Sequence, residues 1–228
     1  MVESTYEKAE HHSDAPVLLN IGGIPGSGKS TLVETLSEKL PSFTVIRLDA
    51  IMTAHPGYQA ESKISASDAF SKYEMPARAA GYLLLKMLVE KNADILFEYS
   101  ATTNDHLRFM IYSRRMGYKT ILARVLTDPE VARARVRDRQ KSDGRHVPEN
   151  LIDERLRAIL RLEKRYRSAV HLFRDVGNYR DINAGEHIFS EDLIESMLND
   201  IRGLRDKKQD AKCANSTKSA LLNSECAA

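Results

Sequence analysis

The segment from Gly23 to Ser30 constrains the fold of this chain more than any other part of it. It reads Gly-Ile-Pro-Gly-Ser-Gly-Lys-Ser and fits the spacing Gly-x₄-Gly-Lys-Ser/Thr. The short apolar run Val17 to Ile21 precedes it, and Lys29 to Leu40, with leucines at helical spacing, follows it. A buried strand, a glycine-rich turn and a helix in this order are typical of a loop that binds phosphate with backbone N–H groups. The segment therefore predicts a nucleotide-binding α/β domain.

The residues of this loop have distinct expected tasks. We expect Lys29 to bridge the β- and γ-phosphate oxygens, the Ser30 hydroxyl to bind Mg²⁺ and Thr31 to reach the α-phosphate. The full set that we expect to bind the nucleotide is Gly23, Pro25, Gly26, Ser27, Gly28, Lys29, Ser30 and Thr31. The predicted cofactors are thus ATP and Mg²⁺. The loop alone does not distinguish a kinase from a hydrolase.

Short apolar runs alternate with helical patterns along the rest of the chain. The expected strands cover residues 17–21, 44–48, 94–99, 119–126 and, more weakly, 171–173. The expected helices cover residues 29–40, 77–91, 105–116, a basic stretch from 129, 149–170 and 188–204. Such alternation predicts a parallel sheet with helices on both faces. We therefore expect an α/β P-loop NTPase fold, nucleotide-kinase-like, as a three-layer sandwich with a central parallel sheet of about five strands.

Polar, aperiodic segments mark the two ends of the chain. We expect residues 1–15 to be a flexible segment, residues 16–204 a single P-loop domain and residues 205–228 a disordered tail. The two cysteines, Cys213 and Cys226, lie in that tail, which favours a reducing compartment over a disulfide framework. We see no secretory signal and no apolar run of membrane-spanning length, so we expect a cytoplasmic protein with no membrane partner. The net charge of +2 argues against a nucleic-acid partner.

Asp49 follows the second expected strand. The carboxyl ends of parallel strands form the ligand crevice, so this side chain should face the γ-phosphate end of the nucleotide. A carboxylate there can orient an attacking hydroxyl or accept its proton. The alternative is that Asp49 caps the next helix. We favour the catalytic role, which predicts transfer to a hydroxyl of a small-molecule acceptor.

More polar residues follow the third expected strand. An ionised Glu98 among apolar neighbours is costly to bury unless it meets a cation or hydrogen-bond donors. We expect Glu98, Ser100 and Thr102 to hold the acceptor together with Asp49, and Glu98 could also reach Mg²⁺ through water. The alternative is a strand-end glutamate that emerges into solvent.

The helix after the fourth expected strand is rich in arginine, with Arg133, Arg135, Arg137 and Arg139. Arg135 and Arg139 share one helical face, and a solvated face is the alternative for at least half of the set. One arginine on the transferred phosphoryl group can contribute about 10³–10⁵ in rate. We choose Arg139 and Arg145, which flank a break at Gly144, as catalytic residues on a lid, together with Lys29 and Asp49.

These motifs together resemble the zeta toxin family of P-loop kinases. The similarity runs from about Val17 to Tyr166 and rests on Gly23 to Ser30, Asp49 followed by His55-Pro56-Gly57-Tyr58, Glu98-Tyr99-Ser100, Met116-Gly117-Tyr118, Arg135 to Arg139 and Gly144 to Glu149. In the third-strand motif, Tyr99 and Ser100 stand where the family usually has Gly-Thr.

The resemblance implies an ATP-dependent kinase that phosphorylates a sugar hydroxyl of UDP-N-acetylglucosamine. It further implies that Asp49 is the base, that Glu98 and Ser100 hold the acceptor, and that Arg139 and Arg145 stabilise the transferred phosphoryl group. An antitoxin protein is the partner that such a family implies.

Other functions stay open on the residues alone. One is a different small-molecule kinase, acting on a nucleoside, a sugar acid or an antibiotic. Another is a nucleotide-dependent regulatory ATPase without an acceptor, which would leave Asp49 without a task. A polynucleotide 5′-kinase is disfavoured by the small net charge and by the lack of interleaved aromatic and basic residues.

Overall fold

The computed structural model describes residues 5–7, 9, 13–143, 147–148, 150–178 and 189–206. The chain divides into two compact units, Met1–Phe189 and Ser190–Ala228, and each is described by itself. The second unit contains a helix over residues 191–206. The expected division into residues 1–15, 16–204 and 205–228 stays a prediction. Within the described residues, none of the helices combines the length and the apolar character that crossing a bilayer requires.

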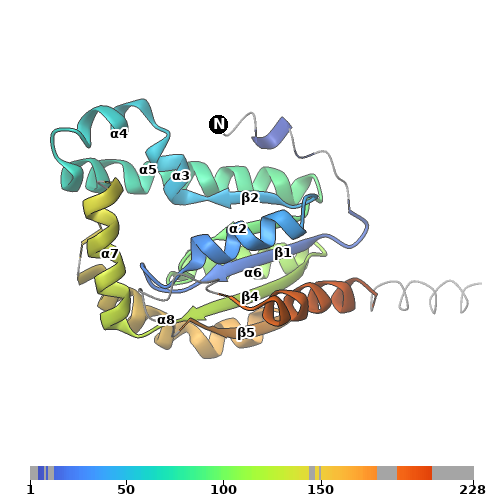
Figure 1. Ribbon diagram of the computed structural model, residues 1–228. Helices are drawn as coiled ribbons and strands as arrows, with labels where there is room; N and C mark the ends of the chain where they lie inside the picture. Colours follow the sequence, from blue (N-terminus) through green and yellow to red (C-terminus); the bar gives the residue numbers. More distant parts are fainter. Residues whose placement is uncertain are drawn as a thin grey trace, which may run out of the picture. The chain divides into compact units, whose positions relative to one another are not determined.

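A five-stranded parallel sheet forms the centre of the first unit (Figure 1). Its strands are β1 (Val17–Gly22), β2 (Thr44–Arg47), β3 (Ile95–Glu98), β4 (Lys119–Leu126) and β5 (Leu172–Gly177). They run in the order β2-β3-β1-β4-β5, and every neighbouring pair is parallel. Ile21 of β1 lies opposite both Glu98 of β3 and Ala123 of β4. This register brings the end of β3 beside the start of the glycine-rich loop.

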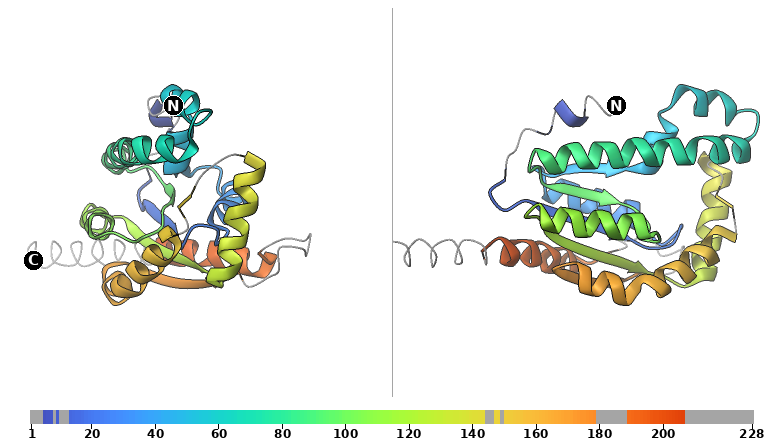
Figure 2. Two further views of the ribbon diagram at one scale, coloured as in Figure 1. Left: turned by 90° about the vertical axis from the view of Figure 1, so that its left-hand side faces the viewer. Right: turned by 180° about the vertical axis from the view of Figure 1, so that it is seen from behind.

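Helices cover both faces of this sheet, which confirms the predicted three-layer α/β architecture (Figures 1 and 2). They are α2 (Lys29–Lys39), α3 (Leu48–Thr53), α4 (Pro56–Glu61), α5 (Ala66–Glu90), α6 (Asn104–Arg115), α7 (Pro129–Asp143) and α8 (Asn150–Ala169). Helices α5, α6 and α8 lie on one face, and α2 lies on the other. On the first face, Leu84, Leu107 and Leu162 of these helices join Leu18 and Phe97 of the sheet in one buried core.

Two helical segments differ from the expected elements. Helix α5 begins well before the expected residue 77, because Ser65 caps it by accepting a hydrogen bond from the backbone N–H of Asp68. The connection after β2 forms α3 and α4, which were not among the expected helices. His55 caps α4, since its Nδ1 accepts from Gly57 N at 3.1 Å. A side-chain cap thus starts both α4 and α5.

A chain of buried hydrogen bonds joins β1 to α5 and α6. Asn20 Nδ2 donates to Phe97 O at 2.8 Å, so Asn20 Oδ1 is the acceptor for His106 Nε2 at 3.0 Å. His106 Nδ1 then accepts from the Tyr82 hydroxyl at 3.1 Å. Burial lowers the pKa of His106 to about 3, so this side chain is neutral in the folded protein.

An ion-pair network fixes α8 to the sheet. Arg124 of β4 donates to Asp175 Oδ1 at 2.7 Å and to Glu163 Oε2 at 2.8 Å. Arg167 of α8 lies 2.9 Å from both of these acids. Hydrogen bonds from Arg124 and Arg167 lower the pKa of Glu163. The network holds in place the helix that contributes an arginine to the site described next.

Candidate active site

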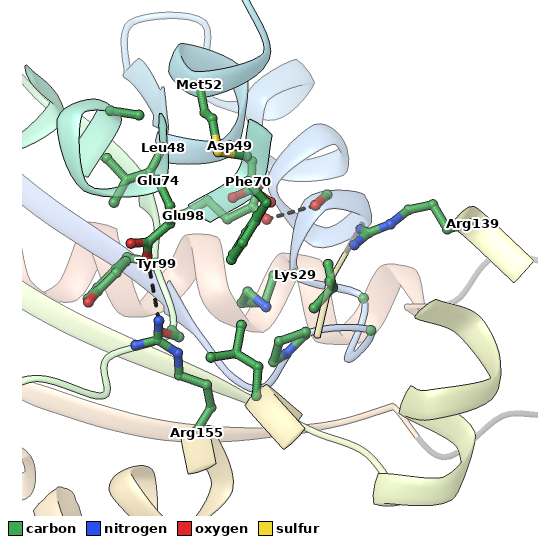
Figure 3. A pocket seen from close by; sticks show the side chains of 18 of the residues that line it. Lys29, Leu48, Asp49, Met52, Phe70, Glu74, Glu98, Tyr99, Arg139 and Arg155 are labelled. Carbon is green, nitrogen blue, oxygen red and sulfur yellow. Dashed lines mark hydrogen bonds and ion pairs between the residues drawn. The ribbon is translucent and has the colours of Figure 1, made fainter. Parts of the chain in front are cut away.

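A cavity of about 360 Å³ opens where β1 and β3 end (Figure 3). The phosphate loop and the start of α2 line one part of it, α3 and α5 another, and α7 and α8 a third. The lining includes these residues singled out from the sequence: Pro25, Gly26, Gly28, Lys29, Ser30, Thr31, Asp49, Glu98, Ser100 and Arg139. Residues expected on the nucleotide and residues expected on the acceptor therefore face one common space.

Three glycines give the phosphate loop its shape. Gly23, Gly26 and Gly28 have φ values of 140°, 77° and 96°, a region that side chains other than glycine rarely adopt. A Cβ on Gly26 would lie 2.4 Å from Ala132 O, and one on Gly28 would lie 2.3 Å from Asn178 Nδ2. Neither position has room for a larger residue.

Hydrogen bonds hold the loop at several points. Gly23 N donates to Ser100 O at 3.4 Å, and Asn178 Nδ2 donates to Ser27 O at 2.7 Å. Lys29 Nζ donates to Ile24 O at 2.8 Å. Gly23 and Ser27 are not among the residues that line the cavity, so they contribute through the shape of the loop. Asn178, which the sequence did not single out, follows β5 and supports the loop through its hydrogen bond to Ser27 O.

Ser30 and Glu98 lie in direct contact. The Ser30 hydroxyl donates to Glu98 Oε1 at 2.7 Å. Arg47 Nε lies 3.6 Å from Glu98 Oε2. The Glu98 side chain is 11% exposed, so it does not emerge into solvent. Burying a carboxylate costs free energy, and the Ser30 hydroxyl and the Arg47 guanidinium offset that cost.

The same pair fits a magnesium ion. Mg²⁺ prefers oxygen ligands, and it is usually held by one or two protein groups in addition to phosphate oxygens and water. A hydroxyl and a carboxylate beside a phosphate loop are such a donor set. The magnesium role of Ser30 stays a prediction, with Glu98 as its neighbour.

Asp49 lines the cavity, but it lies in a helix and not at the end of the expected strand. Strand β2 ends at Arg47, and Asp49 lies in the first turn of α3. Arg47 occupies the N-cap position of that helix, and no side chain caps it, so Asp49 is not the capping residue. Met52 of α3 packs with Ala69 and Ala77 of α5 in a small core. This packing positions the first turn of α3, with Asp49, at the cavity.

Helix α7 contributes two arginines to the cavity, Arg135 and Arg139. They share a helical face, and Arg135 Nη1 is 3.5 Å from Gly26 O, while Arg139 extends from α7 toward the loop (Figure 3). Arg133 is not among the residues that line the cavity, and it pairs with Asp153 Oδ1 at 2.6 Å. Arg145 lies outside the described residues, as does the break at Gly144, so their lid role stays a prediction.

Three charged residues that the sequence did not single out also line the cavity: Glu74, Arg78 and Arg155. Arg155 Nη1 donates to Thr102 Oγ1 at 2.8 Å, and its Nη2 lies 3.6 Å from Glu74 Oε1 (Figure 3). Arg78 pairs with the same glutamate and lies over the ring of Tyr99, 5.8 Å from its centroid. Thr102 thus reaches the site through Arg155, without lining the cavity itself.

One sequence signal could have identified part of this group. Arg78 stands among alanines in a segment that is otherwise apolar, where a charge needs a partner. Arg155 offers no such signal, because charged residues are frequent along its helix.

This chain is similar to known proteins in sequence pattern and in fold. The model of a family described as zeta toxin matches residues 3–184. A search of curated proteins found no match. Among solved structures, one from a study of the PezAT chromosomal toxin–antitoxin system of Streptococcus pneumoniae is 16% identical, with a TM-score of 0.62 over 90% of this chain and 92% of that chain.

Two further solved structures share the fold. Shikimate kinase from Acinetobacter baumannii, in complex with shikimate, is 16% identical, with a TM-score of 0.51 over 86% of this chain and 97% of that one. The AvrRxo1-ORF1:-ORF2 complex with ATP is 13% identical, with a TM-score of 0.56 over 78% of this chain and 60% of that one. The fold is therefore that of P-loop kinases.

Proposed function

Because this chain belongs to the zeta toxin family, we propose that it is a kinase that transfers the γ-phosphoryl group of ATP to a hydroxyl of a small molecule. The family and the kinase fold support a nucleotide-dependent P-loop kinase. The acceptor that we propose is a nucleotide sugar such as UDP-N-acetylglucosamine, on the basis of the family resemblance. Mg²⁺ is the proposed metal cofactor.

One observation carries this proposal. The phosphate-loop residues Lys29 and Ser30 line the same cavity as Asp49 of α3, Glu98 at the end of β3 and Ser100 just after it. Phosphoryl transfer needs the terminal phosphate and the acceptor hydroxyl in line and within reach of one another. A single space that both sets of residues face meets this requirement.

The roles of the residues follow from their chemistry. The backbone N–H groups of the loop and the Lys29 ammonium bind the phosphates. The Asp49 carboxylate orients the acceptor hydroxyl and takes its proton, as the oxygen bonds to the γ-phosphorus and the bond to the β-phosphate oxygen breaks. Arg135 and Arg139 stabilise the negative charge on the transferred group. Ser30 and Glu98 would hold Mg²⁺, which supplies further charge neutralisation at the phosphates when bound.

A partner protein forms part of the proposal. The PezAT structure comes from a study of a toxin–antitoxin system, and the resemblance implies the same kind of partner here. We propose an antitoxin that binds this chain in the cytoplasm, with no role for nucleic acid or membrane.

The test is phosphorylation of a defined acceptor. The purified chain is incubated with ATP, Mg²⁺ and UDP-N-acetylglucosamine, and the products are resolved by mass. The expected result is a gain of one phosphoryl group on the sugar nucleotide, with ADP formed in equal amount. A parallel sample contains a small-molecule metabolite extract with labelled ATP, and its labelled product would identify a different acceptor.

Two outcomes would overturn parts of this proposal. Label on a nucleoside, a sugar acid or an antibiotic, with none on UDP-N-acetylglucosamine, would refute the nucleotide-sugar acceptor. The assignment as a kinase would stand. ATP turnover that no acceptor alters, and that Asp49→Ala leaves unchanged, would instead indicate a regulatory ATPase.

A further inference from the structure

Arg155 of α8 makes a hydrogen bond to a buried hydroxyl beside the cavity. Its Nη1 donates to Thr102 Oγ1 at 2.8 Å. Thr102 is 4% exposed and follows β3. The Arg155 side chain is 17% exposed and faces the cavity, where Glu74 Oε1 lies 3.6 Å from its Nη2. The guanidinium is thus held from α5 on one edge while its other edge contacts Thr102.

This contact determines which way the Thr102 hydroxyl donates. A guanidinium has only donors, so Thr102 Oγ1 must be the acceptor from Arg155. The hydroxyl keeps one proton, and burial makes an unpaired donor unfavourable. In the described part of the chain, the partner that can accept this proton is Ser100 Oγ, at 2.9 Å. Thr102 therefore donates to Ser100.

The direction of that bond determines what Ser100 can offer to a ligand. Ser100 lines the cavity, and its hydroxyl accepts from Thr102. Its own proton is therefore available on the cavity side. Ser100 O also accepts from Gly23 N at the start of the phosphate loop, which fixes the backbone of Ser100 beside that loop.

We infer that Arg155 is a positioning residue that acts through Thr102 and makes Ser100 a hydrogen-bond donor to an oxygen of the bound substrate. The inference rests on the proposed kinase function and deepens it. The ligand atom at Ser100 is an oxygen with free lone pairs, either on the terminal phosphate or on a carbonyl or phosphate group of the acceptor. It is not the hydroxyl that attacks, because a hydrogen bond donated to that oxygen would occupy one of its lone pairs and make it a weaker nucleophile.

Hydrogen positions test this inference without any substrate. Neutron diffraction from crystals of the deuterated chain would locate the deuterium atoms of both hydroxyls. The expected result is one deuterium between Thr102 Oγ1 and Ser100 Oγ, bonded to Thr102, and the Ser100 deuterium directed into the cavity. A deuterium bonded to Ser100 and directed at Thr102 would overturn the inference, whether or not the chain phosphorylates UDP-N-acetylglucosamine.

A kinetic cycle tests the functional consequence, with UDP-N-acetylglucosamine and ATP as the varied substrates. Ser100→Ala, Thr102→Val and Arg155→Met should each raise one of the two KM values about tenfold, the effect of one lost hydrogen bond. A change in the KM for ATP assigns the oxygen to the terminal phosphate, and a change in the KM for the sugar nucleotide assigns it to the acceptor. Thr102→Ser keeps the hydroxyl, so this variant should have the wild-type KM for both substrates.

Non-additivity distinguishes this role from a structural one. In a Ser100→Ala background, Arg155→Met should cause no further rise in KM, because both changes interrupt the same series of bonds. Arg157→Gln, on the exposed side of α8, is the matched control and should leave both KM values unchanged. Full additivity of Ser100→Ala and Arg155→Met, or unchanged KM values in all three variants, would refute the inference. If no acceptor is phosphorylated, the proposed function fails, and the neutron experiment still decides on the hydrogen-bond direction.

Discussion

The Ser30 hydroxyl donates a 2.7 Å hydrogen bond to the Glu98 carboxylate. The two residues come from the first turn of α2 and the last position of β3, and the parallel pairing of β1 with β3 brings them together. A carboxylate is thereby present next to the residue that we expect to bind Mg²⁺. The contact suggests that Ser30 and Glu98 act on the metal as a pair.

Both members of this pair should affect the magnesium requirement. Ser30→Ala and Glu98→Gln should each raise the Mg²⁺ concentration for half-maximal transfer about tenfold or more, since a hydrogen bond or ligand involving a charged group contributes about 1.5–3 kcal/mol. The measurement is a Mg²⁺ titration of the initial rate at saturating ATP. Ser37→Ala on the same helix is the control, because Ser37 Oγ donates to Glu34 O, away from the cavity. A Glu98→Gln titration that matches the wild type would exclude Glu98 from the metal site.

Asp49 should matter for chemistry and not for nucleotide binding. Asp49→Asn removes the proton acceptor and preserves the shape of the side chain, so kcat should fall by about 10²–10⁴-fold. ATP affinity, measured by calorimetry, should stay within about twofold of the wild type because Asp49 lies in α3 and is not part of the phosphate loop. Lys29→Ala is the contrasting variant and should lose both affinity and rate. Equal loss of ATP affinity in the two variants would show that Asp49 has been assigned the wrong role.

The arginines of α7 should divide according to the face on which they lie. Arg139→Gln should lower kcat by about 10³-fold or more if its guanidinium stabilises the transferred phosphoryl group. Arg133→Gln is the matched control on the same helix, because Arg133 pairs with Asp153 outside the cavity. It should keep its kcat and lose only some thermal stability. Similar losses of kcat in the two variants would point to a general effect of charge on α7.

His106 should make stability depend on pH in a defined window. Its pKa is lowered to about 3 by burial, whereas in the unfolded chain it is about 6.5. Between these values the unfolded state binds a proton that the folded state does not, so stability should fall as the pH falls from 6.5 toward 3. For this histidine the slope is at most about 1.4 kcal/mol per pH unit.

The check is urea unfolding of the wild type and of His106→Gln at several pH values from 7 to 4. The variant should be less stable at pH 7, and the difference between the two should shrink as the pH falls. His171, whose pKa burial and neighbouring cations lower to about 4, contributes equally to both curves. Parallel curves would mean that His106 titrates normally.

Local patterns in the sequence were enough to predict the phosphate loop, the strands and the two-sided sheet. Each of these depends on residues that are neighbours in the chain, and the loop also has a fixed spacing of glycines. The helices α3 and α4 were missed because they are short and depend on a cap at His55 and on packing against α5. The capping signal Ser65-Ala66-Ser67-Asp68 was available and would have given the start of α5.

The charged side of the cavity could not be predicted in the same way. Glu74 and Arg155 lie far apart in the chain, and they meet because α5 and α8 lie on the same face of the sheet. Arg155 has no feature that distinguishes it from the other arginines of α8 before the fold is known. Asn178 similarly reaches the phosphate loop only because β5 is the neighbour of β4, at the edge of the sheet.

The contacts of Ser27 and Gly23 with Asn178 and Ser100 have a consequence for nucleotide binding. They tie the loop to the ends of two strands, so its backbone is preorganised for the anion. A loop that is already ordered loses little conformational entropy when the nucleotide arrives, and more of the interaction free energy then appears as affinity. The rigid sheet should therefore raise the affinity of the loop for the phosphates of the nucleotide.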